Sequence, residues 1–303
     1  MPQKFCAPGK KYDAENNTCL TLSQVIAIKD AFNTFISQHD LAPKNFTGGK
    51  IDTIKQPTNL DERGLKKYLL TELHKRMESF CGRDDVCWSK QKFMRNIIGE
   101  KREEIMNGTY RPEGPGNSDD WLATPHIVKI MKQYEMVYPN FVFLGAVPLD
   151  CDEYQGCVLY NIDYDTFLSQ GKTRFGVVFN LDKFGQPGSH WVALYMSIDE
   201  AEISFTDSTG NPPNKIIKRV INDFNKFYQS KFRAKPIYNV NHVAYQKDKS
   251  ECGVYSCNFL IRRLRGESFQ DIMNNALTFE EINACRNVYF RNQISLHEPG
   301  SRC

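Results

Sequence analysis

The sequence lacks a long hydrophobic run. No stretch approaches the 18 or more consecutive apolar residues of a transmembrane helix, and the start, MPQKFCAPGKKYD, has no apolar middle segment of the kind that signal peptides carry. We therefore expect a soluble, intracellular protein with no membrane partner. The sequence also shows no internal repeat and no low-complexity tract, which excludes solenoid and fibrous architectures.

A dominant charge is missing as well. The chain has 39 basic and 36 acidic residues, a formal net charge of +3. A balance this close gives no argument for or against nucleic acid as a partner. With 303 residues, 41% of them hydrophobic and 25% charged, the chain is long enough to bury a core in one large domain or in two.

The ten cysteines lack the C-x2-C pairs that make a zinc site convincing. We therefore expect no structural metal. In an intracellular protein the simplest interpretation is reduced, mostly buried thiols, because free cysteine behaves as a small hydrophobe. The close spacings are Cys6 with Cys19, Cys81 with Cys87, Cys151 with Cys157, and Cys252 with Cys257.

The first 110 residues predict a helical region whose chemistry cannot be read from the sequence. Thr21-Leu22-Ser23-Gln24 has the form of a capping box, and apolar residues then recur at helical spacing up to about Ser37. Gly, Pro, Asn and Asp are concentrated in Asn107–Asp120, which predicts a linker. We place a domain boundary between residues 110 and 111. Two charged segments also have the helical period: LDERGLKKYLLTELHKRMESF and VCWSKQKFMRNIIGEKREEIM.

Residues 111–303 predict a domain of mixed helices and strands. The segments DWLATPHIVKIMKQYE and NKIIKRVINDFNKFYQSKF have amphipathic helical patterns. The middle three of the expected strands are separated by a Gly/Pro loop and a short turn, which favours antiparallel neighbours. The order of elements argues for the α+β class, with a mainly antiparallel sheet flanked by helices. The expected strands are FVFLGAV, RFGVVFNL, HWVALYMSI, EISFTDS and PIYNVNHVAYQ.

A candidate nucleophile, Cys252, stands at the start of a predicted helix in SECGVYSCNFLIRRLRG. Apolar residues follow it at spacings of three and four, and Gly266 ends the pattern. Unpaired backbone N–H groups and the positive end of the helix dipole favour the nucleophilic thiolate form of a cysteine placed there. Gly253 should leave that thiolate uncrowded. Cys257 lies about 140° round the helix, on the apolar stripe, and we assign it to the core.

A cysteine nucleophile needs a histidine base, and His190 is the best candidate because it combines a strand start with a flexible lead-in. Asp207 lies 17 residues later, at the end of the next strand, so a hairpin brings both to the same end of the sheet. Asp207 could instead only open the turn DSTGNPP. His242 is the rival base, but no acid is placed to orient it. The remaining histidines fit other roles: His39, His74, His126 and His297.

Acyl transfer also needs hydrogen-bond donors for the developing oxyanion. Gln246, six residues before Cys252, could supply a side-chain N–H beside the backbone N–H of Cys252. By itself a glutamine at a strand end carries no information. With His190 and Asp207, however, it completes the chain order His, Asp, Gln, Cys, the reverse of the papain order.

The segments GSHWVALY, FTDSTGNPP and YQKDKSECGVYSCNFLIRRL resemble a family of cysteine proteases. The family includes the SUMO-specific proteases, the adenovirus maturation protease and the African swine fever virus polyprotein protease. The resemblance covers about Asp119 to Arg291 and implies a papain-like α+β core without a cofactor. It also implies roles for four residues: Cys252 as nucleophile, His190 as base, Asp207 as the residue that orients it, and Gln246 in the oxyanion hole.

Within that family the chain looks closest to proteases of large cytoplasmic DNA viruses, through CAPGKKY near its start and FLGAVPLD before the catalytic strands. It departs from the swine fever enzyme, which has asparagine where this chain has Asp207, and from the adenovirus enzyme, which has glutamate. The resemblance implies that Trp191 and Trp121 cover a channel for a Gly-Gly segment, although both also fit a core role. A viral protein of this kind would act in the host cytoplasm or the virion.

Four functions remain open at this point. The favoured one is a thiol endopeptidase that trims viral structural precursors, with a protein or polyprotein as its partner. Removal of ubiquitin-like proteins from host targets is a close alternative. Acyl transfer to a protein is a third, because some bacterial effectors with a related His-acid-Cys order are acetyltransferases. The fourth, a binding module, would be expected to have lost one of the four residues, and none is missing.

Overall fold

The computed structural model describes residues 6–38, 51–117, 120–248, 250–292 and 299–303. The chain divides into two compact units, Met1–Arg111 and Pro112–Cys303. This division falls next to the boundary expected between residues 110 and 111. Each unit has its own hydrophobic core.

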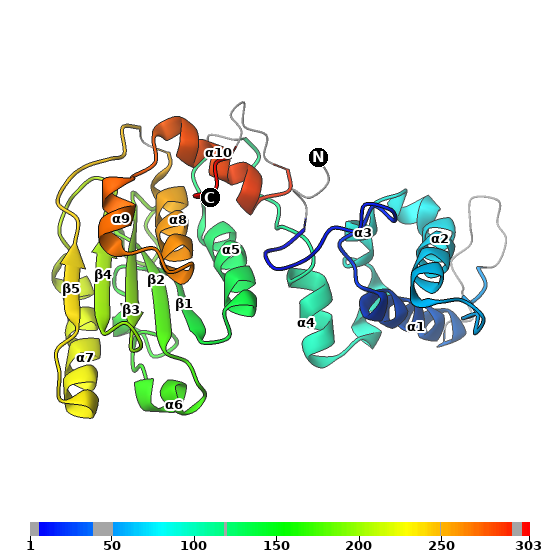
Figure 1. Ribbon diagram of the computed structural model, residues 1–303, viewed down its shortest axis with the longest axis horizontal. Coiled ribbons are helices and arrows are strands. Elements are labelled where there is room, and N and C mark those ends of the chain that lie inside the picture. The colour runs from blue at the N-terminus through cyan, green and yellow to red at the C-terminus, as the bar shows by residue number, and fades with distance from the viewer. Residues whose placement is uncertain (1–5, 39–50, 118–119, 249, 293–298) are drawn as a thin grey trace. The chain divides into compact units, whose positions relative to one another are not determined.

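The first unit is helical (Figure 1). Its α1 begins with the expected capping box, because the backbone N–H of Thr21 donates to the side chain of Gln24 and the backbone N–H of Gln24 donates to the Thr21 hydroxyl. Apolar residues of α1 and α2 pack around the fully buried Trp88. The elements are α1 (Leu22–Gln38), α2 (Glu62–Cys81), α3 (Asp85–Trp88), the 3-10 helix η2 (Lys92–Asn96) and α4 (Gly99–Asn107).

The second unit is built on a five-stranded sheet in the order β1-β2-β3-β4-β5, with the strands side by side in Figure 1. The central pairs β2–β3 and β3–β4 are antiparallel, as the sequence predicts. The α+β class is confirmed. The outer pairs β1–β2 and β4–β5 are parallel, however, so the sheet is mixed rather than mainly antiparallel. The strands are β1 (Phe141–Pro148), β2 (Arg174–Asn180), β3 (Trp191–Ser197), β4 (Glu202–Thr206) and β5 (Ile237–Val240).

Both faces of the sheet are covered. Alternate residues of β3 show this: Trp191, Ala193 and Tyr195 join one core, and Val192 and Leu194 join the other. The first core is shared with α5, α8, α9 and α10, and the second with α6 and α7. The helices are α5 (Thr124–Val137), α6 (Tyr164–Ser169), α7 (Lys215–Phe232), α8 (Cys252–Leu264), α9 (Phe269–Asn274) and α10 (Phe279–Tyr289), with a 3-10 turn, η3 (Cys151–Glu153).

Helix α8 lies inside the first of these cores, the one that contains Trp191. All thirteen of its residues are buried, including Arg262 and Arg263, whose charges pair with glutamates. A helix enclosed on every side is typical of the centre of a domain. The helix that begins at Cys252 is therefore held rigidly from all directions.

The expectation of reduced cysteines was wrong for eight of the ten. Four disulfides form, and the free cysteines are Cys252 and Cys257. The prediction failed because it rested on the expected compartment, whereas the pairs are local in sequence, with separations of 13, 6, 6 and 18 residues and Cα atoms 5.1 to 5.5 Å apart. The pairs are Cys6–Cys19, Cys81–Cys87, Cys151–Cys157 and Cys285–Cys303.

Candidate active site

The candidate nucleophile is the first residue of α8, as the sequence predicts. Cys252 is 2% exposed, and it is one of the groups that raise the pKa of His190. Gly253 also has a packing role that the sequence does not reveal. A Cβ at this position would lie 3.0 Å from Cβ of Leu122 and 3.3 Å from Cδ1 of Trp191. Glycine thus lets these two side chains pack closely against the start of α8, where an added Cβ would push them back by a few tenths of an ångström.

The strand register brings His190 and Asp207 together. Ala193 of β3 pairs with Thr206 of β4, Asp207 directly follows β4, and His190 directly precedes β3. His190 Nε2 lies 2.7 Å from Asp207 Oδ1. The two residues are offset along the strands, as expected, and the long imidazole side chain spans the offset.

Asp207 is a fixed acceptor rather than only a turn residue. Its carboxylate is 2% exposed and accepts hydrogen bonds from the backbone N–H and the hydroxyl of Thr209, at 2.8 and 2.7 Å. Its own backbone N–H donates to the side chain of Asn241, which also donates to the Asp207 carbonyl. The residue therefore both opens the turn after β4 and contacts the His190 imidazole.

The electrostatics favour a protonated imidazole between two acidic groups. Burial alone would lower the pKa of His190, but hydrogen bonds with Asp207 and Cys252, and the charges of these two groups, raise the pKa to about 9. Burial would also raise the pKa of Asp207, but hydrogen bonds from His190 and Thr209 keep the pKa below its ordinary value. At neutral pH this arrangement holds an imidazolium beside Cys252.

Gln246 is held at both ends of its amide. Its Oε1 accepts from the Ser208 hydroxyl at 2.5 Å, and its Nε2 donates to the carbonyl of Asp248 at 2.8 Å. The backbone N–H of Gln246 donates to the carbonyl of Ser208, next to Asp207. An amide nitrogen carries two N–H groups, so one of them is left for a further acceptor.

The other described histidines lie in different settings. His242 is exposed, and its side chain makes no hydrogen bond within the described residues. Nδ1 of His126 accepts the backbone N–H of Ala123 and caps α5. His74 packs against Trp88 in the first unit, where burial lowers its pKa. His39 and His297 lie outside the described residues.

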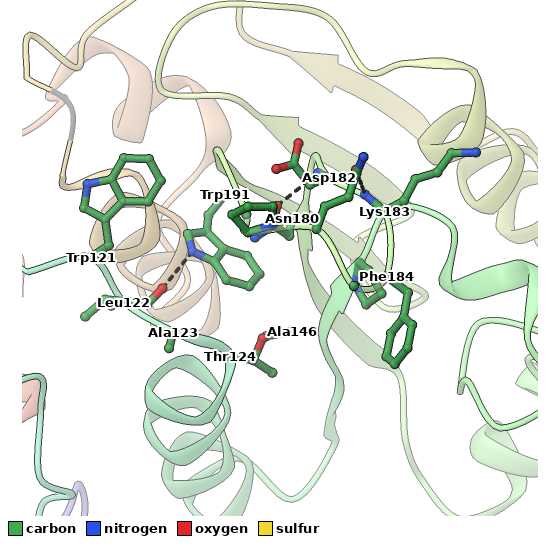
Figure 2. Close-up of a pocket in the computed structure, with 15 residues that line it drawn as sticks. Trp121, Leu122, Ala123, Thr124, Ala146, Asn180, Asp182, Lys183, Phe184 and Trp191 are labelled. Atoms are coloured by element: carbon green, nitrogen blue, oxygen red, sulfur yellow. Dashed lines mark hydrogen bonds between the residues drawn. The ribbon is translucent and has the colours of Figure 1, made fainter.

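A cleft of about 440 Å³ is lined by Leu122 and Trp191, the two residues next to Gly253 at the start of α8 (Figure 2). One wall comes from the segment before α5, with Trp121, and the other from the loop between β2 and β3, with Phe184. Trp191 lines the cleft between them but is only 4% exposed. Its indole N–H donates to the Leu122 carbonyl at 2.8 Å. Trp121 is 44% exposed. Both tryptophans predicted for a substrate channel therefore line this cleft.

The sequence did not single out the opposite wall. Phe184 is 74% exposed and packs against Tyr154, while its backbone N–H donates to Asp150. The available signal was a large aromatic side chain inside a Gly/Pro loop, a position where burial is not expected. That loop was interpreted only as a flexible lead-in to His190.

Neither a metal site nor a membrane-spanning helix is found in the described part of the chain. No group of three or more His, Cys, Asp or Glu residues there is placed to hold a metal ion. Within the same described residues, no helix is both long enough and apolar enough to cross a membrane.

Comparison with known proteins gives a consistent result. Residues 177–295 match the Ulp1 protease family, C-terminal catalytic domain. R355 of Acanthamoeba polyphaga mimivirus, whose name classes it as a thiol protease, is 46% identical over 99% of this chain and 97% of its own. A cysteine protease of African swine fever virus (isolate Tick/Malawi/Lil 20-1/1983) is 25% identical over 60% of this chain and 72% of its own.

Solved structures agree on the fold. Two crystal structures of the African swine fever virus protease superpose with TM-scores of 0.58 and 0.60, at 20% and 16% identity. They cover 78% and 96% of this chain, and 94% and 96% of their own chains. With the near full-length similarity to R355, these findings show that the chain belongs to the Ulp1 family of cysteine proteases.

Proposed function

We propose that the protein is an endopeptidase that uses Cys252 as nucleophile, His190 as general base and acid, and Asp207 to orient the imidazole. One observation carries the proposal. A single imidazole lies 2.7 Å from Asp207, and the free cysteine at the start of a buried helix helps to raise its pKa. A nucleophile, a base and a third group that orients the base are the arrangement that acyl transfer requires.

The proposed reaction has two steps. The Cys252 thiolate attacks the carbonyl carbon of the scissile bond, and the His190 imidazolium gives its proton to the leaving amine, which leaves a thioester on Cys252. His190 then takes a proton from water, and the resulting hydroxide attacks the thioester. The acid product leaves, and Cys252 is restored as a thiolate beside a protonated His190.

The oxyanion would be stabilised by donors fixed before the substrate arrives. One is the backbone N–H of Cys252 at the N-terminus of α8, and the other is the second N–H of the Gln246 side chain. The bonds from Gln246 to Ser208 and Asp248 support this role, because they hold the amide in one orientation. A preorganised donor stabilises a charge without a reorganisation cost.

The cleft supports a preference for small residues ahead of the cut. It passes Trp191, whose indole is held in place by a hydrogen bond to Leu122 and by packing against Gly253. A large side chain at the scissile position would meet the indole, whereas a Gly-Gly or Gly-Ala pair would pass it. We therefore expect cleavage after such pairs. Replacing alanine by leucine in the substrate, at the residue before the cut, should abolish turnover.

We place this activity in the processing of viral structural precursors, in the host cytoplasm or the virion, because the similar proteins come from large DNA viruses. A second candidate is isopeptidase activity on a ubiquitin-like protein. It is favoured by the name of one relative, from African swine fever virus (isolate Pig/Kenya/KEN-50/1950), which calls that protein a SUMO-1 cysteine protease. Both candidates require the same nucleophile and differ in the substrate beyond the Gly-Gly pair.

The decisive experiment measures kcat/KM for matched peptides with Gly-Gly and Leu-Leu ahead of the scissile bond. Ubiquitin-like fusion proteins are assayed in parallel as substrates for the second candidate. We expect turnover of the Gly-Gly peptide alone, and none after alkylation of the enzyme. Trp191→Ala should relax the preference, and Trp191→Phe, which keeps a ring but loses the bond to Leu122, is its matched control. Equal kcat/KM values for the two peptides with wild-type enzyme would refute the channel.

A further inference from the structure

A fully buried ion pair stands directly beside the candidate nucleophile. Glu251, the residue before Cys252, and Arg286 of α10 both have side chains that are 0% exposed. Arg286 Nε lies 3.0 Å from one carboxylate oxygen of Glu251, and Nη2 lies 3.0 Å from the other. This two-pronged contact fixes both the position and the plane of the Glu251 carboxylate.

Glu251 does not act as an ordinary helix cap. It occupies the N-cap position of α8, but its carboxylate makes no capping hydrogen bond and turns to Arg286 instead. A carboxylate at that position would normally interact with the helix N-terminus and compete there with a thiolate. The contact with Arg286 therefore keeps the negative charge of Glu251 away from the N–H groups that Cys252 needs.

The same guanidinium also holds the cleft wall. Arg286 Nη2 donates to the backbone carbonyl of Asp120 at 2.9 Å. Two residues later the carbonyl of Leu122 accepts from the indole of Trp191. The backbone on both sides of Trp121 is thus fixed, and its side chain stays exposed in the cleft. Leu122 in turn packs against the glycine that follows Cys252.

Stability alone does not account for such a pair. Burying two charges costs desolvation free energy that their attraction often fails to recover, and an apolar pair of similar size is frequently as stable. The pair nevertheless joins three separate elements at the reactive centre: the start of α8, the helix α10 and the segment before α5. Its position, rather than its contribution to folding, is the feature to explain.

We propose that Arg286 is a positioning residue for catalysis, which sets the nucleophile and the Trp121–Leu122 wall in one fixed geometry by binding Glu251 and the Asp120 carbonyl together. This proposal rests on Cys252 being the nucleophile. The titratable groups nearby include Asp248, which acts on Glu251, His190, which acts with Cys252, and Asp120 and His126, on which Arg286 acts. Loss of Arg286 would leave the Glu251 carboxylate next to Cys252 without its charged partner, with only the neutral donors Ser250 and Asn283.

The test compares Arg286→Met with Arg262→Met. Arg262 is a similarly buried arginine of α8 whose partner, Glu267, is 30% exposed and lies at the far end of the helix, so it serves as the control for the loss of a buried, ion-paired arginine. We expect Arg286→Met to lower kcat at least tenfold and to slow alkylation of Cys252 by iodoacetamide at pH 7 at least tenfold. Arg262→Met should lower the melting temperature but change both rates by less than about twofold.

Two further variants separate positioning from folding. Arg286→Lys keeps the charge but cannot bind both Glu251 oxygens and the Asp120 carbonyl, so its rates should lie between those of wild type and Arg286→Met. If Arg286→Met does not fold, the uncharged pair Glu251→Gln/Arg286→Met replaces it, with the same tenfold losses expected. A wild-type kcat and a wild-type alkylation rate in folded Arg286→Met, or in the folded double variant, would overturn the proposal.

The proposed catalytic role of Cys252 has its own readout, which keeps the two failures apart. Full activity of Cys252→Ser would reject the nucleophile and with it this proposal. If Cys252→Ser is inactive but Arg286→Met keeps kcat and the alkylation rate as Arg262→Met does, only the positioning role of Arg286 is rejected.

Discussion

The start and the middle of α8 offer two cysteines in one buried helix, and their surroundings differ completely. Both thiols are free and almost inaccessible, with 2% of Cys252 and 0% of Cys257 exposed. Cys257 lies among apolar side chains, and burial raises the pKa of its thiol far above the ordinary value. Cys252 instead faces His190. We therefore expect reactivity to be set by the partner and by the position in the helix, since burial is common to both.

The largest expected effect separates these two cysteines. Cys252→Ala should abolish peptide cleavage, because no other described thiol faces the imidazole. Cys257→Ala should keep kcat within a few-fold of wild type and cost about 1 kcal/mol of stability through the small cavity. Steady-state kinetics on samples checked by circular dichroism give the answer. A comparable loss of catalysis in both folded variants would contradict the assignment.

The second effect concerns the oxyanion. Gln246→Ala should lower kcat by about 10²-fold to 10³-fold with little change in KM, because the amide is expected to bind the charge that develops only in the transition state. Gln246→Glu is a useful companion variant, since it keeps the size but removes the donor. A wild-type rate for Gln246→Ala would remove this role and leave the backbone N–H of Cys252 as the donor.

A smaller effect, with a clear signature in pH, is expected at Asp207. Because the His190 pKa is raised to about 9, the imidazolium is present at neutral pH and is lost as the pH rises through that value, so kcat/KM should fall above about pH 9. Asp207→Asn removes the negative charge that helps to hold the proton. The alkaline limb should then move to lower pH, with a loss of about 10-fold to 100-fold at pH 7.

That pH profile has a matched control. Asp248→Asn also removes a carboxylate near the site, but one that no described hydrogen bond joins to His190. It should leave the alkaline limb in place. An unchanged limb in Asp207→Asn would show that another group holds the His190 proton.

The smallest effect tests the packing between the start of α8 and the cleft. Gly253→Ala places a methyl group 3.0 Å from Leu122 and 3.3 Å from Trp191, so the wall must shift by a few tenths of an ångström. We expect kcat/KM to fall by about tenfold at most, mainly through KM. Gly266→Ala, whose added methyl meets no atom, controls for the loss of a glycine, although its positive φ makes it strained. Unchanged KM in Gly253→Ala would show that the wall is free to move.

Local patterns predicted much of the second unit. The start of α8 at Cys252 followed from apolar spacing, and the meeting of His190 and Asp207 followed from two strands joined by a short turn. Both are properties of residues close together in the chain. At the sheet edges, β1 pairs in parallel with β2, and β5 pairs in parallel with β4. These pairings depend on long connections, which leave no local signature in the sequence.

Other features could not be predicted because they join distant residues. Arg286 reaches Glu251 across 35 positions and Asp120 across 166. In the sequence Arg286 is only a charged residue in a helical pattern. The disulfides were missed because the prediction rested on the expected compartment, since a paired cysteine and a buried free thiol cannot be told apart by hydrophobicity.

The complete enclosure of α8 has a consequence for hydrogen exchange. Amides in a helix buried on all sides exchange only when the whole unit opens, whereas amides of an exposed loop exchange through local fluctuations. Lys183 to Pro187 are exposed at the rim of the cleft, while every residue of α8 is buried. The reactive end of the helix and the exposed rim should therefore differ by orders of magnitude in protection. A substrate that closes on the rim would slow exchange there and leave the rates in α8 unchanged.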